Sequence, residues 1–474
     1  MTRLALPDAT FFALESPARP MHAGALMLFD PPAGESATDF AARLVAEFRS
    51  VPPVAPFNRR PDLTLGRLPR WVTDDDVDLN YHVRHIALPA PGTPQRLMEL
   101  VGHLYVPLLD RNRPLWECYV IEGLHGGAVA VFCKLHHGLA DGISGARLLV
   151  GPLSTSKTHR AIRPIWAPQP APSRPASHTI SPNPDPPNQR DLLKPLMGQV
   201  QTVAGTAQRI VEVVLQVAGL RRGARALPFS APRLTVDARP QQPSRSFAIF
   251  DLPLSQARCV AEHVGGSVND VILAVCDDAM NRYLAANGEK LTGPLVASIA
   301  VSTRANGDDT PSNAAALAQV RLGAPDASPR ERLEQIVARA AAVKTQVRQS
   351  SKGVLELETA VYMGGAQLRE ELSVSRQNVP PVANIVVSNI PGNADKQLYL
   401  GGAPLTGMYA VPIVPPSHLV NFTLVSYRDN LCVGVGAAHN VIPDTTRIAE
   451  LARQSFAELA KAVIAPGRIE NPTP

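Results

Sequence analysis

Residues 128–142 read AVAVFCKLHHGLADG, an apolar run that ends in two histidines and a glycine-bounded turn. Such a run predicts a buried β-strand, and the residues after it are typical of the start of a helix. Because side chains alternate between the two faces of a strand, His136 and His137 are predicted to point in opposite directions. One should be buried in the scaffold, whereas the other should face a cleft, where a neutral imidazole accepts a proton near neutral pH.

Composition predicts a large globular protein without a nucleic-acid partner. The chain has 474 residues, 45% of them hydrophobic, and a formal net charge of only +5 from 46 basic and 41 acidic residues. This length predicts more than one domain, and the scattered charges form no basic tract. The cysteines form no CxxC pair and are predicted to be reduced core thiols. They are Cys118, Cys133, Cys259, Cys276 and Cys432.

Two features of the sequence bear on location. Pro7 and Asp8 interrupt the apolar amino terminus, so no export signal is expected there. No run of about 18 consecutive apolar residues occurs, which is the length that a membrane-spanning helix needs. We therefore expect a cytoplasmic protein, with any contact to the inner face of the cell membrane being peripheral.

A proline-rich stretch divides the chain. Nine prolines fall between Pro164 and Pro187, and such a segment cannot form a regular hydrogen-bond ladder. The predicted organisation is an N-terminal domain, a linker, a linking helix and a C-terminal domain. Their ranges are 1–152, 153–190, 191–225 and 226–474.

The predicted linking helix is amphipathic. Apolar residues spaced by three and four mark one face from Leu193 to Ala218. The favoured interpretation is that this face packs on the two domains and clamps them. Arg221, Arg222 and Arg225 leave a membrane-surface role open, although a favourable charge at a helix end explains the same arginines.

The C-terminal half alternates predicted strands and helices. Ser328, Pro329 and Glu331 form a capping box that opens a helix through about Gln349, and Asp444 is typical of the cap of a final helix. The fold class is therefore α/β with mixed pairing. Short apolar runs predict strands at 294–301, 383–387, 422–426 and 431–436.

A zinc site and a serine hydrolase are the two alternatives for the histidine pair. A zinc site is disfavoured because adjacent histidines on a strand diverge, and no third and fourth ligands occur at standard spacings. A serine hydrolase is disfavoured because the sequence contains no GxSxG elbow. A general base at the end of a strand remains the favoured interpretation.

With these residues in view, the chain resembles the bacterial, actinobacterial-type wax ester synthase/diacylglycerol acyltransferase family, within the CoA-dependent acyltransferases. The resemblance covers nearly the whole length, and the ordered motifs make it specific. It implies two chloramphenicol-acetyltransferase-like α/β sandwich domains with mixed sheets and an active-site tunnel between them. The motifs are PDATFF at 7–12 with Pro20, Met21, His22 and Gly24, RPLWE at 113–117, HHGLADG at 136–142, VNDV at 268–271 and SNIPG at 388–392.

The resemblance implies an acyl-CoA-dependent O-acyltransferase that makes triacylglycerol from diacylglycerol, with wax ester synthesis from a long-chain alcohol as a close variant. Acyl-CoA would be a co-substrate, and no cofactor or metal is expected. Two alternatives stay open: a lipid-binding or droplet-associated protein with little turnover, and a condensation-type enzyme using carrier-bound acyl groups. The chain lacks a DFG motif, and Pro415 to Asn421 replaces a stretch where members typically carry glycines.

The resemblance assigns roles within these motifs. His137 would be the general base, and His136 part of the scaffold. Asp141 would hold the loop through a salt bridge, and Gly142 would allow a close approach that a side chain blocks.

Two further motifs carry weaker predictions. Asn269 and Asp270 either cap the helix that follows or, for Asn269, donate to the oxyanion, and the two interpretations are held equal. Trp116 is predicted to be a packing anchor. Ser388 to Gly392 is predicted to form a turn at the cleft.

Overall fold

The computed structural model describes most of the chain. The described residues are 2–4, 6–64, 69–139, 142–168, 229–239, 241–302, 315–350, 352–372, 378–390, 392 and 396–464. The predicted linking helix at 191–225, the linker from 169 onward and Asp141 lie outside these residues.

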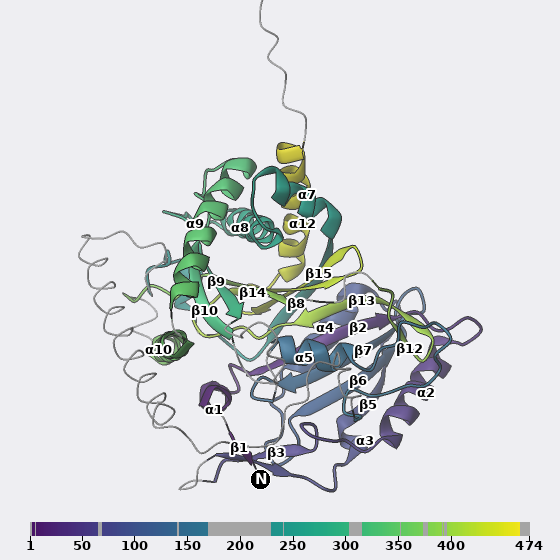
Figure 1. Ribbon diagram of the computed structural model, residues 1–474. Helices are drawn as coiled ribbons and strands as arrows, with labels where there is room; N and C mark the ends of the chain where they lie inside the picture. The colour runs from purple at the N-terminus through teal and green to yellow at the C-terminus, as the bar shows by residue number, and fades with distance from the viewer. Residues whose placement is uncertain are drawn as a thin grey trace, which may run out of the picture.

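Two six-stranded mixed sheets lie next to each other and carry the fold (Figure 1). The first has the strand order β12-β13-β2-β7-β6-β5, and the second has the order β10-β9-β11-β14-β15-β8. A small sheet with the order β1-β4-β3 flanks the first. The α/β class with mixed pairing is confirmed, because β5 is parallel to β6 and β11 is parallel to both β9 and β14, whereas the other pairs in the two large sheets are antiparallel.

The strands are β1 Thr2–Arg3, β2 His22–Phe29, β3 Arg59–Asp62, β4 Arg70–Thr73, β5 Val83–Ala87, β6 Trp116–Glu122, β7 Val129–His136, β8 Arg245–Pro253, β9 Val296–Ser302, β10 Ala315–Arg321, β11 Ile385–Ile390, β12 Tyr399–Leu400, β13 Ala403–Val411, β14 Val420–Tyr427 and β15 Asn430–Ala438. The helices are α1 Leu6–Leu14, α2 Ala37–Ser50, α3 Leu79–His82, α4 Pro94–Tyr105, α5 Gly142–Val150, α7 Leu254–His263, α8 Val268–Ala286, α9 Pro329–Gln349, α10 Lys352–Glu371 and α12 Thr445–Ile464, with a short 3₁₀ helix, η1, at Thr235–Ala238.

A strand exchange joins the two halves of the chain. β13 leaves the C-terminal half and pairs antiparallel with β2, so that Met408 lies opposite Met27. The predicted C-terminal domain, residues 226–474, therefore contributes β12 and β13 to the sheet of the N-terminal half. On the other side, β13 contacts β14 and β15 of the second sheet.

Helices α7, α8, α9 and α12 pack around the second sheet (Figure 1). Residues of α7, α8, α9 and α12 share one apolar core with the sheet. The predicted capping box of α9 is confirmed, because the Ser328 hydroxyl and N–H both donate to Glu331 Oε2, at 2.8 and 3.0 Å. Asp444 likewise caps α12 by accepting the Arg447 N–H at 2.9 Å.

A buried ion pair joins α8 to α9. Arg332 Nη1 donates to Asp277 Oδ2 at 2.5 Å, and the two side chains are 3% and 0% exposed. The same carboxylate also accepts the Gly323 N–H at 3.0 Å and Asn281 Nδ2 at 2.9 Å. Three hydrogen-bonding groups thus depend on one buried carboxylate.

The first part of the predicted linker belongs to the packed core. Ile162, Ile165 and Trp166 are buried against the first sheet, and Trp166 Nε1 donates to the Val51 carbonyl at 3.0 Å. Trp166 also stacks on Trp116, with ring centroids 4.6 Å apart, which confirms Trp116 as a packing anchor. Residues 153–168 are therefore part of the N-terminal domain rather than an extended connection.

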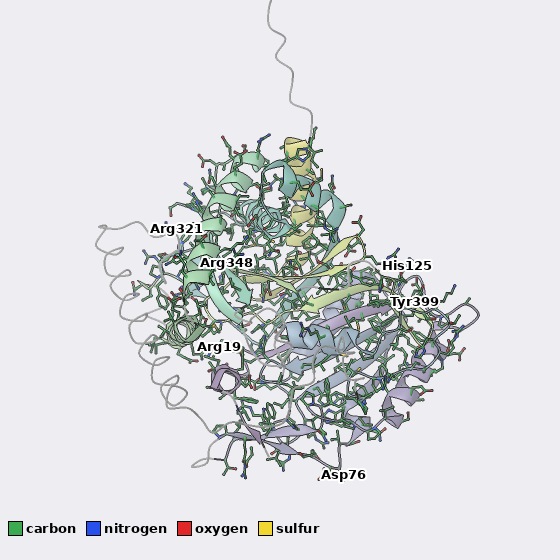
Figure 2. All side chains as sticks on the ribbon, viewed as in Figure 1. Arg19, Asp76, His125, Arg321, Arg348 and Tyr399 are labelled. Atoms are coloured by element: carbon green, nitrogen blue, oxygen red, sulfur yellow. The ribbon has the colours of Figure 1, made fainter. Side chains whose placement is uncertain are left out.

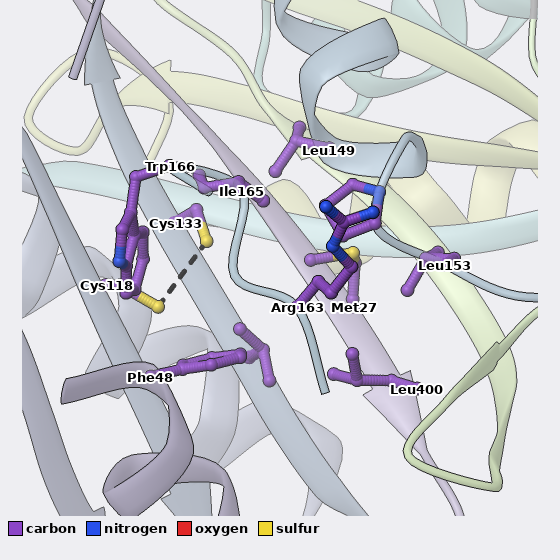
Figure 3. A pocket seen from close by; sticks show the side chains of 12 residues that line it. Met27, Phe48, Cys118, Cys133, Leu149, Leu153, Arg163, Ile165, Trp166 and Leu400 are labelled. Atoms are coloured by element: carbon purple, nitrogen blue, oxygen red, sulfur yellow. Dashed lines mark hydrogen bonds between the residues drawn. The ribbon is translucent and has the colours of Figure 1, made fainter. Parts of the chain in front are cut away.

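An apolar cavity of about 10 Å³ lies between α5 and the first sheet (Figure 3). This volume is about that of one water molecule, so it holds no acyl chain as it stands. Cys118 and Cys133 line it, with their sulfur atoms 3.6 Å apart. The contact with Cys133, together with burial, raises the pKa of the Cys118 thiol. All five cysteines are free, and all but Cys259 are buried, as predicted for core thiols.

One predicted turn is wrong. Ser388, Asn389 and Ile390 continue β11, because they pair in register with Thr423 to Val425 of β14. The apolar run that we used to predict this strand ended at Val387, so the polar residues after it were mistaken for a turn.

Length and hydropathy decide whether a described helix could span a membrane. No single helix among them is long and apolar enough to cross a membrane. Only α7 and α8 together pass that test, across a bend of 99°.

Candidate active site

The two histidines at the end of β7 lie in different environments, as predicted. His136 is 1% exposed, whereas His137 is half-buried. The N–H of His136 donates to the Leu115 carbonyl at 3.0 Å, and the N–H of His137 donates to the Met21 carbonyl at 2.8 Å. Leu115 belongs to the RPLWE motif and Met21 to the amino-terminal motif, so both motifs hold the histidine pair through their backbone.

Helix α1 packs on both imidazoles. Phe11 stacks on His137 with ring centroids 4.2 Å apart and an interplanar angle of 23°. Phe12 stacks on His136 at 4.3 Å and 20°. The PDATFF sequence thus has a structural explanation, because its two phenylalanines each fix the plane of one imidazole ring.

Gly138 closes the turn after the pair. Its N–H donates to His136 Nδ1 at 3.0 Å. A side chain at this position would lie 2.8 Å from the Phe12 ring and 3.3 Å from the Asp8 carbonyl. Gly138 is therefore a position where a close approach excludes a side chain, and the same role for Gly142 stays a prediction.

Glu15 is a site residue that sequence reasoning missed. Its side chain is 1% exposed, and Oε1 lies 3.4 Å from His136 Nε2. Oε1 also accepts the Met21 N–H at 3.3 Å, and Oε2 accepts Arg111 Nη2 at 2.9 Å. Burial alone would raise the pKa of Glu15, but His136, Arg111 and the Met21 N–H together lower it to about 2. The carboxylate is therefore ionised at neutral pH.

A second polar cluster lies next to the histidine pair. Lys134 is fully buried on the same strand, and its Nζ lies 3.4 Å from Glu117 Oε2 and 3.2 Å from the Leu104 carbonyl. Burial lowers the pKa of Lys134, and Glu117 opposes that shift. His22 pairs with His136 across β2 and β7, and its Nε2 lies 2.6 Å from the Tyr105 carbonyl. These contacts tie β7 to the C-terminal end of α4.

The VNDV and SNIPG motifs meet each other. Asn389 Nδ2 donates to Asn269 Oδ1 at 2.6 Å. Asn269 Oδ1 is therefore used as an acceptor. The Nδ2 group of the same side chain is a donor, which is what an oxyanion would need. The helix that follows HHGLADG, α5, contacts β11, and β11 contacts α8. The structure therefore places three motifs on adjoining elements from the two sheets.

Asp270 has a structural explanation. Its Oδ2 accepts the Ser267 N–H at 2.9 Å and the Ser267 hydroxyl at 2.6 Å. Its Oδ1 lies 3.1 Å from Lys344 Nζ, and the residue is 3% exposed. The capping interpretation is confirmed for Asp270, whereas the oxyanion role of Asn269 stays a prediction.

Comparison with known proteins decides the family. Residues 4–272 match the model of the wax ester synthase/diacylglycerol acyltransferase catalytic domain, and residues 312–460 match the C-terminal domain of the same family. The chain belongs to the wax ester synthase/diacylglycerol acyltransferase family. The predicted membership of this acyltransferase family is therefore confirmed.

Relatives in the wax ester synthase/diacylglycerol acyltransferase family match over nearly the full length. The Mycobacterium tuberculosis protein named probable diacylglycerol O-acyltransferase Tgs4 is 33% identical over 462 residues, which cover 97% of this chain and 96% of the relative. The M. tuberculosis protein named probable diacylglycerol O-acyltransferase tgs2 is 34% identical over 465 residues, covering 96% and 98%.

Solved structures give the same result for the fold. The wax ester synthase/diacylglycerol acyltransferase of Marinobacter aquaeolei VT8 is 29% identical, with a TM-score of 0.72 and coverage of 98% of this chain and 100% of that one. The first condensation domain of the CDA synthetase has a TM-score of 0.58 at 18% identity, covering 98% and 96%, and shares the fold alone. The two-domain chloramphenicol-acetyltransferase-like architecture is therefore confirmed.

The remaining residues of the family motif HHxxxDG are only partly described. Asp141 lies outside the described residues, so its predicted salt bridge stays a prediction. Gly142 begins α5, and its surroundings are not described. Among the described residues, no group of three or more His, Cys, Asp or Glu side chains could hold a metal ion.

The stretch that departs from the family pattern, Pro415 to Asn421, connects several elements. Ser417 has a positive φ of 64°, a conformation that favours glycine, the residue that family members typically carry in this region. Its N–H donates to Glu370 at 3.1 Å, and its hydroxyl accepts the Val382 N–H at 3.2 Å. His418 Nε2 lies 2.9 Å from the Ser298 hydroxyl. These bonds connect the residues just before β14 to α10, to β9 and to the segment before β11.

The ionised Glu15 predicts how stability depends on pH. The pKa is about 2 in the folded protein and 4.5 ordinarily, so the unfolded chain binds more protons between these values. The stability that this carboxylate supplies is present above about pH 4.5 and is lost as the pH falls toward 2, in total about 3 kcal/mol. Urea unfolding should therefore show a gap between wild type and Glu15→Gln that narrows from pH 7 to pH 3. The exposed variant Glu99→Gln should show no gap, and a Glu15 gap that widens in acid would contradict the assignment.

Proposed function

We propose that the protein transfers a long-chain acyl group from acyl-CoA to the hydroxyl of diacylglycerol, forming triacylglycerol, and that long-chain alcohols are accepted as a variant. The observation that carries the proposal is His137, which β7 presents half-buried, with its backbone on Met21 and its ring stacked on Phe11. The family membership and the names of the mycobacterial relatives support the substrate class.

The proposed reaction needs one base and no covalent acyl-enzyme. His137 takes the proton from the acceptor hydroxyl as that oxygen attacks the thioester carbonyl. The tetrahedral intermediate then collapses, the carbon–sulfur bond breaks, and the CoA thiolate takes the proton back from the imidazolium. Asn269 Nδ2 is the donor that we assign to the oxyanion. Acyl-CoA is a co-substrate, and no resident cofactor or metal enters the scheme.

The experiment is a transfer assay with the purified full-length chain. Labelled long-chain acyl-CoA is supplied with diacylglycerol, with a long-chain alcohol, or with no acceptor. We expect labelled triacylglycerol above the control without acceptor. Binding of acyl-CoA without transfer to either acceptor would favour the alternative of a lipid-binding or droplet-associated protein. Transfer from a carrier-bound but not a CoA-bound acyl group would favour a condensation-type enzyme.

We also propose that the protein works at a lipid surface from the cytoplasm, docking through α10. Among the described residues, the exposed large apolar ones are Val361 and Leu368 on α10 and Leu372 directly after it, which are 59%, 59% and 50% exposed. Their spacing of seven and four residues places them on one face of the helix. Exposed apolar stripes of this kind are typical of lipid or protein contact sites. Arg348, exposed near the end of α9, precedes α10 in the chain and suits anionic head groups (Figure 2).

The opposite face of α10 supports this assignment. Met363 packs with Leu14 and Met21, in a cluster that also includes Phe11, the residue stacked on His137. One helix therefore separates the exposed apolar stripe from the aromatic wall of the candidate site.

Leu368→Asp tests this docking surface. The charge should reduce co-sedimentation with anionic vesicles several-fold, because a buried carboxylate opposes transfer into the interface. Leu368→Ala should have a smaller effect, and transfer to a short-chain, detergent-dispersed acceptor should be unchanged. A different occupant would be the segment before Phe229, a residue that packs on Gly365. In that case Leu368→Asp would lower the unfolding temperature and leave vesicle binding as it was.

A further inference from the structure

Glu15 is a buried carboxylate that takes no part in the proposed reaction. This carboxylate lies just after α1, is almost fully buried, and contacts groups from three other segments. It does not touch His137. Its contacts are with His136, the neighbour of His137, with Met21, which bonds to the His137 backbone, and with Arg111.

One hydrogen bond and one carboxylate contact define the tautomer of His136. The Gly138 N–H donates to His136 Nδ1, so that nitrogen carries a lone pair and no proton. The ring proton of a neutral imidazole must then be on Nε2, which faces Glu15 Oε1 at 3.4 Å. His136 therefore lies between the turn at Gly138 and the carboxylate, with Nδ1 accepting the Gly138 N–H and Nε2 within ion-pair distance of Glu15 Oε1. It cannot serve as a second base.

Glu15 also controls the other support of His137. Oε1 accepts the Met21 N–H, and the Met21 carbonyl accepts the His137 N–H. Oε2 accepts Arg111 Nη2, whose guanidinium also donates to the Phe12 carbonyl at 3.1 Å. One carboxylate thus accepts from donors on both of its oxygens, a role that requires an acceptor-only side chain.

We propose that Glu15 is the positioning residue of this acyltransferase. Its contact with His136 favours the tautomer with the proton on Nε2, and its bond to the Met21 N–H anchors that residue. Through these two contacts Glu15 fixes the turn that presents the His137 imidazole. The proposal rests on the proposed function for its kinetic test, but the tautomer of His136 can be measured without any turnover.

Glu15→Gln is the informative substitution because it keeps the shape and removes one acceptor. A carboxamide has one oxygen and one NH₂ group. If the NH₂ faces His136, that ring must move its proton to Nδ1, where it opposes the Gly138 N–H. If the NH₂ faces Arg111, two donors oppose each other. Either orientation disturbs the frame, whereas Glu15→Asp keeps two acceptors on a shorter arm and should recover part of the loss.

The test combines kinetics with nitrogen-15 NMR of histidine-labelled protein, in which His136 is assigned by comparison with His136→Asn. Wild type should show the tautomer with the proton on Nε2. Glu15→Gln should show a mixed or reversed tautomer and a kcat about 10- to 100-fold lower, with the KM for acyl-CoA within about twofold. Glu15→Asp should lie between the two, and Glu99→Gln, an exposed glutamate, should match wild type.

Two results would overturn the proposal: a wild-type His136 protonated on Nδ1, or a Glu15→Gln enzyme with wild-type kcat. Should Glu15→Gln not fold, Arg111→Gln leaves the carboxylate in place and is expected to give a smaller fall in kcat with the wild-type tautomer. If His136 in Arg111→Gln no longer carries its proton on Nε2, Glu15 is not the group that controls the tautomer. If wild type transfers no acyl group, the proposed function fails, and the tautomer still decides the role of Glu15.

Discussion

His137→Ala is expected to lower kcat/KM for acyl transfer by about 10²- to 10⁴-fold, the range that a general base contributes. The loss should appear in kcat, because the alanine removes a proton acceptor rather than a binding surface. The Phe11 ring would lose its stacking partner, but the His137 backbone bond to Met21 does not depend on the side chain. The measurement is initial-rate kinetics with labelled acyl-CoA and diacylglycerol.

His125→Ala is the matched control. His125 is exposed and lies before β7, at the opposite end of the strand from His136 (Figure 2). It should retain wild-type rates and a wild-type unfolding temperature. Equal rates for His137→Ala and wild type would remove His137 from the reaction, and loss of activity in both variants would indicate damage to β7 rather than loss of a base.

Arg332→Met is expected to destabilise the protein by about 3 to 5 kcal/mol, because it leaves the carboxylate of Asp277 buried without its charge partner. The methionine fills much of the same volume, so the effect is mainly electrostatic. Chemical denaturation should report it as a lower midpoint. The activity per folded molecule should be unchanged, because the pair joins α8 to α9 and does not contact the histidines.

Arg330→Met provides the control for this ion pair. Arg330 pairs with Glu334 on the exposed face of the same helix, at 2.9 Å. Exposed pairs of this kind contribute about 0.5 kcal/mol or less. A similar loss of stability in both variants would mean that α9 responds to any change of charge. The buried pair would then contribute no more to stability than the exposed one.

Local signals predicted the elements well. Ser328, Pro329 and Glu331 located the start of α9 correctly, because capping is a contact between residues three apart. Strand alternation predicted different environments for His136 and His137, and their burial differs, although β7 ends at His136 and His137 already lies in the turn. The family resemblance added the order of the motifs, and the backbone bonds of Leu115 and Met21 explain why those motifs accompany the histidines.

Nonlocal contacts could not be predicted in this way. Glu15 has no motif of its own, and its partner Arg111 lies 96 positions away. A charged residue between Leu14 and Pro17, directly after a phenylalanine pair, was the one available signal for it. The pairing of β13 with β2 spans most of the chain and depends on which edge of a sheet is left open, information that no short window contains.

The strand exchange also sets an order for biosynthesis. β2 begins at His22, directly after Met21. One of its two edges pairs with β13, residues 403–411. During synthesis at about 5 to 20 residues per second, that edge stays open for tens of seconds after β2 has left the ribosome. Open edges of apolar strands invite pairing with other chains. A nascent chain of this protein therefore needs its last quarter before its first sheet is closed, and we expect truncation before β13 to give aggregation rather than a smaller active enzyme.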